Sequence, residues 1–245
     1  MSPSEKNKFI SNLIKSYVDQ MPVKAQSLVI GISGGIDSSV SSTLSAMTGI
    51  KTIVLTMPIR QKNNQHDLSL KHQGWLIKNF KNVEAHTINL DKLFESFSST
   101  LKKFNNEHGY ANSRARLRMT TLYQVAAANK GIVVGTGNKV EDFGVGFYTK
   151  YGDGGVDISP IADCNKTEVW ELGKELGILK EIIDAPPTDG LWDDGRTDEG
   201  QLGFKYEDLE DAMKNPNSPH RQEYEKIRKQ NLHKMEPIPV CKIPS

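Results

Sequence analysis

Cysteine is scarce in this chain of 245 residues, because Cys164 and Cys241 lie far apart and belong to no CxxC pattern. This scarcity excludes a disulfide framework and a cysteine-rich zinc cluster, and it is typical of the reducing cytoplasm. Long apolar runs are missing too, since none approaches the roughly 20 residues of a membrane-spanning helix, and the polar N-terminus lacks a signal-peptide core. We therefore expect a cytoplasmic protein with no membrane partner.

An excess of either charge is also absent, because 31 basic residues balance 30 acidic ones and leave a formal net charge of +1. General nucleic-acid binders carry a strongly basic balance, so we expect no nucleic-acid partner. Any polyanionic ligand would have to be held by a local site. The length fits one domain over residues 1–245, because single cores stop growing near roughly 250–300 residues.

Short apolar runs that predict buried strands alternate with amphipathic segments along the chain. The strands are expected at 28–32, 52–57, 85–89 and 132–135, and the helices at 4–22, 37–47, 68–80, 91–104, 113–129, 165–177, 206–213 and 218–233. Ser4, which precedes Glu5, is the expected cap of the first helix. The alternation predicts the fold class α/β, with an open, mostly parallel sheet and helices on both faces.

Glycine is dense between Gly137 and Gly155, and this stretch is interpreted as a functional loop. The helix that follows is expected to begin at Asn165, where Glu168 completes a capping box. The polar segment 189–199 has two interpretations, a lid that orders over a ligand or a solvated loop.

The segment Ser33–Ser39 directly follows the first expected strand and directly precedes a helix. Its adjacent glycines allow a sharp turn and a close approach of an anion, while the helix start supplies unpaired N–H groups and serine hydroxyls. A phosphate group would fit there. The loop lacks the Walker lysine and the third glycine of the dinucleotide fingerprint, so it is a phosphate loop of another kind.

Asp37 is the most informative residue of this loop. A carboxylate beside a phosphate would repel it unless a divalent cation bridged the two groups. The same residue could instead cap the helix with no ligand present, because aspartate is a favoured N-cap. The loop alone leaves both alternatives open.

The motif SGGIDSS after a strand resembles the pyrophosphate loop of the N-type ATP pyrophosphatases, which split ATP into AMP and pyrophosphate to activate a carbonyl or carboxyl oxygen. Further segments are similar to one branch of them, the NAD synthetase family. They are Ala115–Met119, Gly135–Glu141, Phe147–Gly155, Asn165–Glu168 and the pair His233-Lys234. The resemblance implies a single domain with a Rossmann-like, adenine nucleotide alpha-hydrolase-like fold and no glutaminase domain.

The resemblance also implies roles for individual residues. ATP, the co-substrate, would contact Gly31, Ile32, Ser33, Gly34, Gly35, Ile36, Asp37, Ser38, Thr136, Lys166 and Thr188. Deamido-NAD, the dinucleotide that carries nicotinic acid, would contact Arg116, Lys150, Asp157, His233 and Lys234. Asp37 and Glu141 would hold Mg²⁺, and the catalytic residues would be Lys166 and Asp153.

At three of these positions, the residue type and its place in the sequence also indicate a role without the resemblance. Glu141 follows an expected strand, at the end of the sheet where ligands of open α/β folds bind. Arg116 and Arg118 are two residues apart on a helix and therefore point to different faces, so only one should reach a given ligand. Because the resemblance assigns Arg116 to the dinucleotide, Arg118 is interpreted as a surface charge. Lys166 in a first helical turn opposes the helix dipole, which indicates a function. Because Asp142 is adjacent to Glu141, the identity of the carboxylate that would bind the metal together with Asp37 stays open.

By resemblance, the chain would be a ligase that performs the last step of NAD biosynthesis. The carboxylate of deamido-NAD would attack the α-phosphorus of ATP and displace pyrophosphate, and free ammonia would then displace AMP to give NAD. Asp153 is the expected base for the ammonium proton. A homodimer is the expected assembly.

Two rival functions remain open at this stage. Another ATP pyrophosphatase, such as a tRNA-thiolating or GMP-amidating enzyme, is disfavoured by the cysteine content and the balanced charge. A non-catalytic nucleotide sensor is disfavoured because Asp37, Glu141 and Lys166 are all present.

Overall fold

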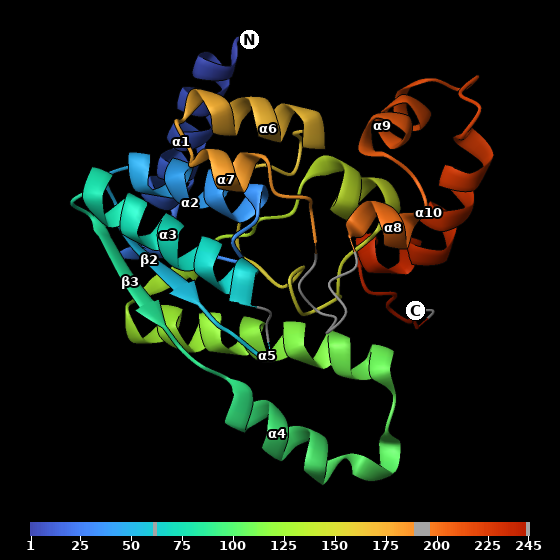
Figure 1. The fold of residues 1–245 in the computed structure, drawn as a ribbon, viewed down its shortest axis with the longest axis horizontal. Coiled ribbons are helices and arrows are strands. Elements are labelled where there is room, and N and C mark those ends of the chain that lie inside the picture. The colour runs from blue at the N-terminus through green and yellow to red at the C-terminus, as the bar shows by residue number, and fades with distance from the viewer. Residues whose placement is uncertain (61–62, 189–196, 244–245) are drawn as a thin grey trace.

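The computed structural model of the protein describes residues 1–60, 63–188 and 197–243. Within these residues, four parallel strands form a sheet in the order β3-β2-β1-β4 (Figure 1). The strands are β1 (Ser27–Gly31), β2 (Lys51–Thr56), β3 (Val83–Thr87) and β4 (Gly131–Val133). Strand order reverses between β1 and β4, and such a switch point opens a crevice at the carboxyl ends of the strands.

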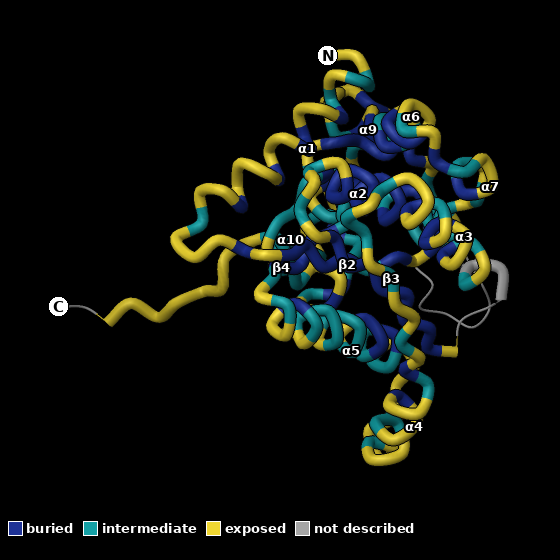
Figure 2. Tube along the Cα trace, turned by 90° about the vertical axis from the view of Figure 1, so that its left-hand side faces the viewer, coloured by how far each residue is buried: buried dark blue, intermediate teal, exposed yellow. Residues whose placement is uncertain are grey.

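Helices cover both faces of this sheet because its central strands, β1 and β2, are apolar on both faces. Leu28 and Ile30 of β1 are fully buried against α1 (Pro3–Gln20), α2 (Ile36–Met47), α3 (Asn63–Asn79) and α6 (Lys166–Glu175). Val29 points to the other face, where α4 (Asp91–Thr100) and α5 (Glu107–Ala128) lie. In Figure 2, β2 lies in the buried centre of the molecule, whereas the edge strand β3 is partly exposed.

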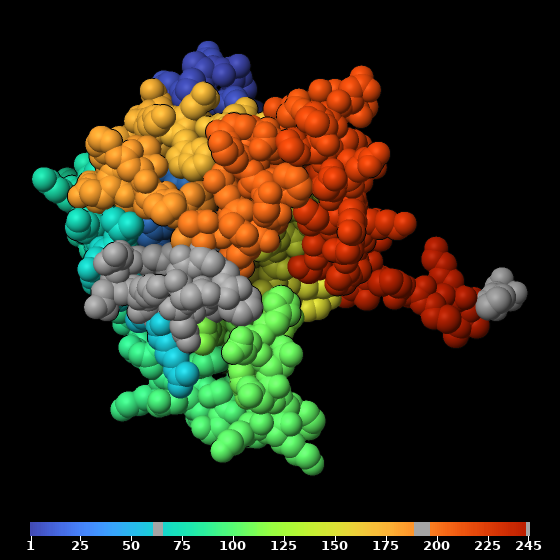
Figure 3. Space-filling model, turned by 45° about the vertical axis from the view of Figure 1, so that its right-hand side comes forward, coloured from blue at the N-terminus to red at the C-terminus, as the bar shows by residue number. Residues whose placement is uncertain are grey.

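The C-terminal third adds a second layer of short helices beside the sheet. It contains α7 (Lys180–Ile183), α8 (Asp198–Leu202), α9 (Tyr206–Lys214) and α10 (Arg221–Met235). A small core joins α9 and α10 to a π-helical segment, η2 (Lys139–Val145). In Figure 3, α9 and α10 form one continuous block at the side of the molecule, from which the C-terminal tail projects.

The predicted α/β class with an open parallel sheet is confirmed. The capping box of Asn165 and Glu168 is also confirmed. The cap of the first helix was wrong, because Ser2 and not Ser4 accepts from the backbone N–H of Glu5. None of the helices in the described part of the chain combines the length and apolar character needed to cross a bilayer.

Two further boundaries differ from expectation. The helix expected from residue 113 begins at Glu107, because the Asn106 side chain caps it by accepting from Gly109 N at 2.7 Å after the short 3₁₀ turn η1 (Lys102–Phe104). The glycine-dense stretch is not all loop, since Asn138 caps η2 by accepting from the N–H groups of Val140 and Glu141. Of the segment with two interpretations, residues 189–196 lie outside the described residues.

Candidate functional site

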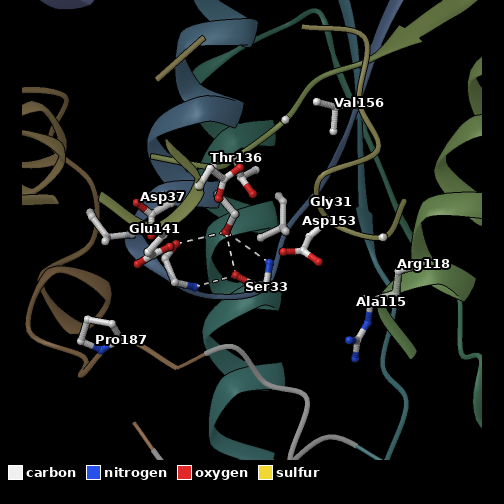
Figure 4. Close-up of a pocket in the computed structure, with 18 of the residues that line it drawn as sticks. Gly31, Ser33, Asp37, Ala115, Arg118, Thr136, Glu141, Asp153, Val156 and Pro187 are labelled. Atoms are coloured by element: carbon white, nitrogen blue, oxygen red, sulfur yellow. Dashed lines mark hydrogen bonds between the residues drawn. The ribbon is translucent and has the colours of Figure 1, made fainter. Parts of the chain in front are cut away.

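A cavity of about 240 Å³ lies at the carboxyl ends of β1 and β4, where the switch point predicts one. Its wall includes ten of the eleven residues predicted to contact ATP: Gly31, Ile32, Ser33, Gly35, Ile36, Asp37, Ser38, Thr136, Lys166 and Thr188. Glu141 and Asp153 line it as well. Figure 4 shows Asp37 and Glu141 together at one side of the cavity and Arg118 at the other.

The phosphate loop turns sharply at Gly34, whose φ of 91° lies in the region that favours glycine. The N-cap of α2 is Gly35, without a side-chain cap. The alternative in which Asp37 caps this helix is therefore wrong, and its carboxylate is directed elsewhere. Ser33 Oγ and Ser38 Oγ are 3.0 Å apart, and Ser33 Oγ accepts from Gly35 N. These hydroxyls and amides form a cradle that suits phosphate oxygens.

Lys166 and two carboxylates form a charged cluster beside this loop. Lys166 Nζ donates to Asp37 Oδ2 at 2.5 Å and to Glu141 Oε1 at 2.9 Å. The Lys166 side chain is only 2% exposed, and Asp37 and Glu141 are 18% and 15% exposed. The cluster joins the first residue of α6 to the first turn of α2 and to η2, so three distant parts of the sequence meet at one point.

The pKa values within the cluster follow from burial and opposing charge. Burial would lower the pKa of Lys166, but the two carboxylates raise it above its usual value and keep the ammonium charged. Burial raises the pKa of Asp37, with Glu141 adding to the rise and Lys166 opposing it. Burial would also raise the pKa of Glu141, but Lys166 and the phenol of Tyr206 hold it below its usual value.

Sequence reasoning missed two residues that hold these carboxylates. Asn138 donates from Nδ2 to Asp37 Oδ1 at 3.1 Å. Tyr206, which is fully buried at the start of α9, donates from its hydroxyl to Glu141 Oε1 at 2.5 Å. In the sequence, Tyr206 is one apolar residue of an amphipathic helix, so no local signal reveals its polar contact.

The donor set of Asp37 and Glu141 fits Mg²⁺, which prefers hard carboxylate oxygens. Both carboxylates already contact one cation, the Lys166 ammonium, and so lie close enough to share another. Over the described ranges, no group of three or more His, Cys, Asp or Glu side chains is arranged to hold a metal. A cation at this cluster would therefore take most of its ligands from phosphates and water.

Asp142 also lines the cavity. Burial, together with the nearby charges of Asp153 and Glu141, raises the pKa of Asp142 well above its usual value. Glu141 is the better partner of Asp37 at a cation site, because both of these carboxylates contact the Lys166 ammonium.

The two arginines of α5 face opposite ways, as their spacing predicts. Arg118 lines the cavity and donates from Nε to the carbonyl of Met57, which follows β2, so its interpretation as a surface charge was wrong. Arg116 is exposed, lies outside the cavity wall and donates to the carbonyl of Lys150 at 3.3 Å. Position on the helix alone could not decide which arginine faces the cavity.

The residues predicted for deamido-NAD form a second group beside the cavity. Lys150 Nζ donates to the carbonyl of His233 at 2.7 Å, and Lys234 Nζ donates to the carbonyls of Gly146 and Tyr148. Together with Arg116, these contacts bring the end of α10 onto the glycine-rich loop. The result is a cluster of cations whose hydrogen-bond partners are neutral carbonyl groups.

Asp157 lies apart from that cluster. Its carboxylate accepts from the backbone N–H of Val133 at 2.7 Å and from the hydroxyl of Tyr123 at 3.1 Å. Burial and the neighbouring Asp157 raise the pKa of Tyr123 to about 12. These contacts fasten the loop to the edge of β4, and they leave Asp157 outside the cavity wall.

A parallel α/β sheet with a glycine-serine loop at its switch point, facing a buried lysine–carboxylate cluster, defines a nucleotide-binding protein of the phosphate-loop type. The particular family follows from its sequence. The family model described as NAD synthase matches residues 7–243, and the chain belongs to that family.

Named relatives agree with this assignment. The chain is 40% identical over 191 residues to the NH(3)-dependent NAD(+) synthetase of Carboxydothermus hydrogenoformans, and the match covers 76% of each chain. The solved structure of NMN synthetase from Francisella tularensis has a TM-score of 0.91 at 32% identity, over 99% of this chain and 100% of that one. The NH3-dependent NAD synthetase from Campylobacter jejuni, at 24% identity and a TM-score of 0.79 over 99% and 100% of the two chains, shares the fold.

Proposed function

We propose that this chain is a ligase that uses ATP and ammonia to convert deamido-NAD into NAD, with AMP and pyrophosphate as the other products. The observation that carries the proposal is the cavity in which the phosphate loop faces Lys166, Asp37 and Glu141. Family membership supports the same activity, because curated relatives at up to 40% identity are named NH(3)-dependent NAD(+) synthetases.

The ATP half of the reaction depends on neutralising the charge of the triphosphate. The amides and hydroxyls of the phosphate loop would bind phosphate oxygens, and Lys166 would turn from its carboxylates toward them. Among the described residues, Thr188 Oγ1 is buried without a hydrogen-bond partner and lines the same cavity, so it is a further candidate donor to a phosphate. Mg²⁺ bound by Asp37 and Glu141 would neutralise charge that develops on the departing pyrophosphate.

The second half of the reaction needs a base for ammonium. Asp153 lies in the cavity wall, and its Oδ1 accepts from the backbone N–H of Thr149 at 3.0 Å, so its position is set by the loop. A carboxylate held there can take a proton from ammonium, and the ammonia so formed then attacks the carbonyl carbon of the acyl-adenylate and displaces AMP. Arg116, Lys150 and His233 would hold the anionic pyridine nucleotide beside it.

Incubation with ATP, Mg²⁺, ammonium chloride and deamido-NAD tests the proposal. We expect NAD and AMP to form in equal amounts, with none formed when ammonium is omitted. Formation of AMP without NAD would contradict the proposed ligase activity and support hydrolysis of ATP instead. Glutamine in place of ammonium tests the nitrogen donor, and equal rates with glutamine would contradict the prediction that the chain is one synthetase domain without a glutaminase.

A second substrate deserves a direct comparison. The structure of the Francisella tularensis NMN synthetase matches this chain at a TM-score of 0.91, against 0.79 for the Campylobacter jejuni enzyme at the same coverage. The printed name of the Francisella tularensis relative, which is 32% identical to this chain, makes a mononucleotide the alternative carboxylate substrate. Measurement of kcat/KM for nicotinic acid mononucleotide and for deamido-NAD decides between them, and a tenfold preference for the mononucleotide would reverse our choice.

A homodimer and a cytoplasmic location stay predictions. Phe9, Leu13 and Tyr17 recur every four residues along α1 and are 58%, 44% and 43% exposed, and an apolar stripe of this kind supports association. Light scattering coupled to gel filtration measures the assembly, and a monomer at micromolar concentration would contradict the dimer.

A further inference from the structure

The ammonium of Lys166 sits where burial and the backbone both disfavour a cation. Its side chain is 2% exposed, and it belongs to the first residue of α6, next to the positive end of the helix dipole. A buried charge persists only with close partners and good geometry. The groups that hold Lys166 and its carboxylates therefore decide whether the cluster has one arrangement or several.

Tyr206 contacts two members of this cluster, Glu141 and Lys166. Its hydroxyl donates to Glu141 Oε1 at 2.5 Å, the same oxygen that accepts from Lys166 Nζ at 2.9 Å. The centre of its ring lies 5.0 Å from Lys166 Nζ, a cation–π distance. The ring packs edge-on against Trp170 of α6 at 5.9 Å, which fixes its orientation. The short contact of the phenol is therefore with Glu141, and a longer one at 3.4 Å reaches Asp198 Oδ2.

The next turn of α9 holds the start of α6. Glu210 Oε1 accepts from the backbone N–H of Thr167 at 3.0 Å, and Oε2 accepts from Thr167 Oγ1 at 2.7 Å. Thr167 directly follows Lys166, and an anion at this position also offsets the helix dipole. Tyr206 and Glu210 are four residues apart, so one face of α9 holds both Glu141 and the backbone that carries Lys166.

We propose that Tyr206 is a positioning residue for the ATP half of the site and acts through Glu141. This inference rests on the proposed function only in that the cavity binds ATP. The phenol supplies Glu141 with a second donor, so the carboxylate keeps its place when Lys166 turns toward a phosphate. Without the hydroxyl, Glu141 loses one of the donors that orient it, so the buried carboxylate is held less firmly in place when Lys166 turns toward ATP.

Direct binding of α,β-methylene-ATP with Mg²⁺, measured by calorimetry, tests the inference. Tyr206→Phe keeps the ring and loses the hydroxyl, and we expect about tenfold weaker binding, the size typical of a lost hydrogen bond to a charged group. The KM for ATP should rise equally, while the KM for the pyridine nucleotide stays within about twofold. Tyr224→Phe is the matched control, because Tyr224 is buried in the same core of α9 and α10, and its affinity should be unchanged.

The double variant Tyr206→Phe with Glu141→Gln separates positioning from general damage. If Tyr206 acts through Glu141, the double variant binds the analogue as well as Glu141→Gln alone. Additive losses, or wild-type affinity in Tyr206→Phe, would overturn the inference, and so would equal losses for both substrates. An unmodified protein that fails to bind the analogue would instead overturn the proposed function, so the two failures are distinguishable.

Discussion

The two sides of the site are built in opposite ways. On the ATP side, Lys166 is buried and its partners are the carboxylates of Asp37 and Glu141. On the pyridine nucleotide side, Lys150 and Lys234 donate to backbone carbonyls, and His233 is exposed. The first set of charges is satisfied by other charges, whereas the lysines of the second set are only half-buried and are held by neutral groups.

This difference has a physical cause and a consequence for binding. A buried ammonium requires counter-charges before any ligand arrives, since an unpaired buried ion costs several kcal/mol. A half-buried ammonium keeps part of its hydration and can be held by neutral carbonyl groups alone. The ATP side is therefore rigid and coupled to the fold, while the cations of the other side can exchange a carbonyl for a phosphate at little cost.

The largest expected effect is that of replacing Lys166, the buried cation of the ATP side, on both activity and stability. Lys166→Met removes the cation from between two buried carboxylates, and we expect ATP turnover to fall by about a thousandfold and the free energy of unfolding to fall by about 3–5 kcal/mol. AMP formation and urea denaturation measure the two effects. Lys174→Met, in the exposed last turn of the same helix, is the control and should change neither quantity. A stable and active Lys166→Met protein would contradict the proposed difference between the two sides of the site.

Asp153→Asn is expected to separate the two half-reactions. The variant keeps the shape of the side chain but cannot take a proton, so NAD formation should fall by about a hundredfold. Exchange of labelled pyrophosphate into ATP, which requires adenylation only, should persist at a rate near that of the unmodified protein. Equal loss of exchange and amide formation would count against the assignment of Asp153 as the base.

The arginines of α5 give a reciprocal test of which side each one serves. Arg118→Gln should raise the KM for ATP about tenfold, because Arg118 lines the cavity and a charge-assisted contact is lost. Arg116→Gln should instead raise the KM for the pyridine nucleotide, with the KM for ATP unchanged. Steady-state kinetics with each substrate varied in turn measure both constants. The opposite pattern would mean that the two sides have been assigned the wrong way round.

The smallest expected effect is the response to salt. An increase from about 0.05 to 0.5 M sodium chloride shortens the Debye length and screens exposed charges much more than buried ones. We expect the KM for the pyridine nucleotide to rise about threefold, with a smaller rise for ATP. Potassium acetate at matched ionic strength controls for a specific effect of chloride. An equal rise of the two KM values would contradict the proposal that the charges on the ATP side are better shielded from salt than those on the pyridine nucleotide side.

Much of the fold and half of the site could be predicted from local sequence. Apolar runs predicted β1, β2 and β4, and the alternation of strands and helices predicted β3. The phosphate loop was recognised because strand, glycines and helix start are adjacent in sequence. The π-helical segment η2 was missed, because its cap, Asn138, stands within a glycine-dense stretch that resembles an open loop. The group of Arg116, Lys150 and His233 came from a family resemblance and from no pattern in the residues themselves.

By itself, the sequence determined what depends on neighbours along the chain: the strands, the capped helices and the cradle of amides between β1 and α2. Only the tertiary structure decided what those elements bring together. Lys166 meets Asp37 across 129 residues, and Tyr206 meets Glu141 across 65. Such contacts depend on how helices pack around the sheet, and no spacing in the sequence encodes the distance between atoms on different elements.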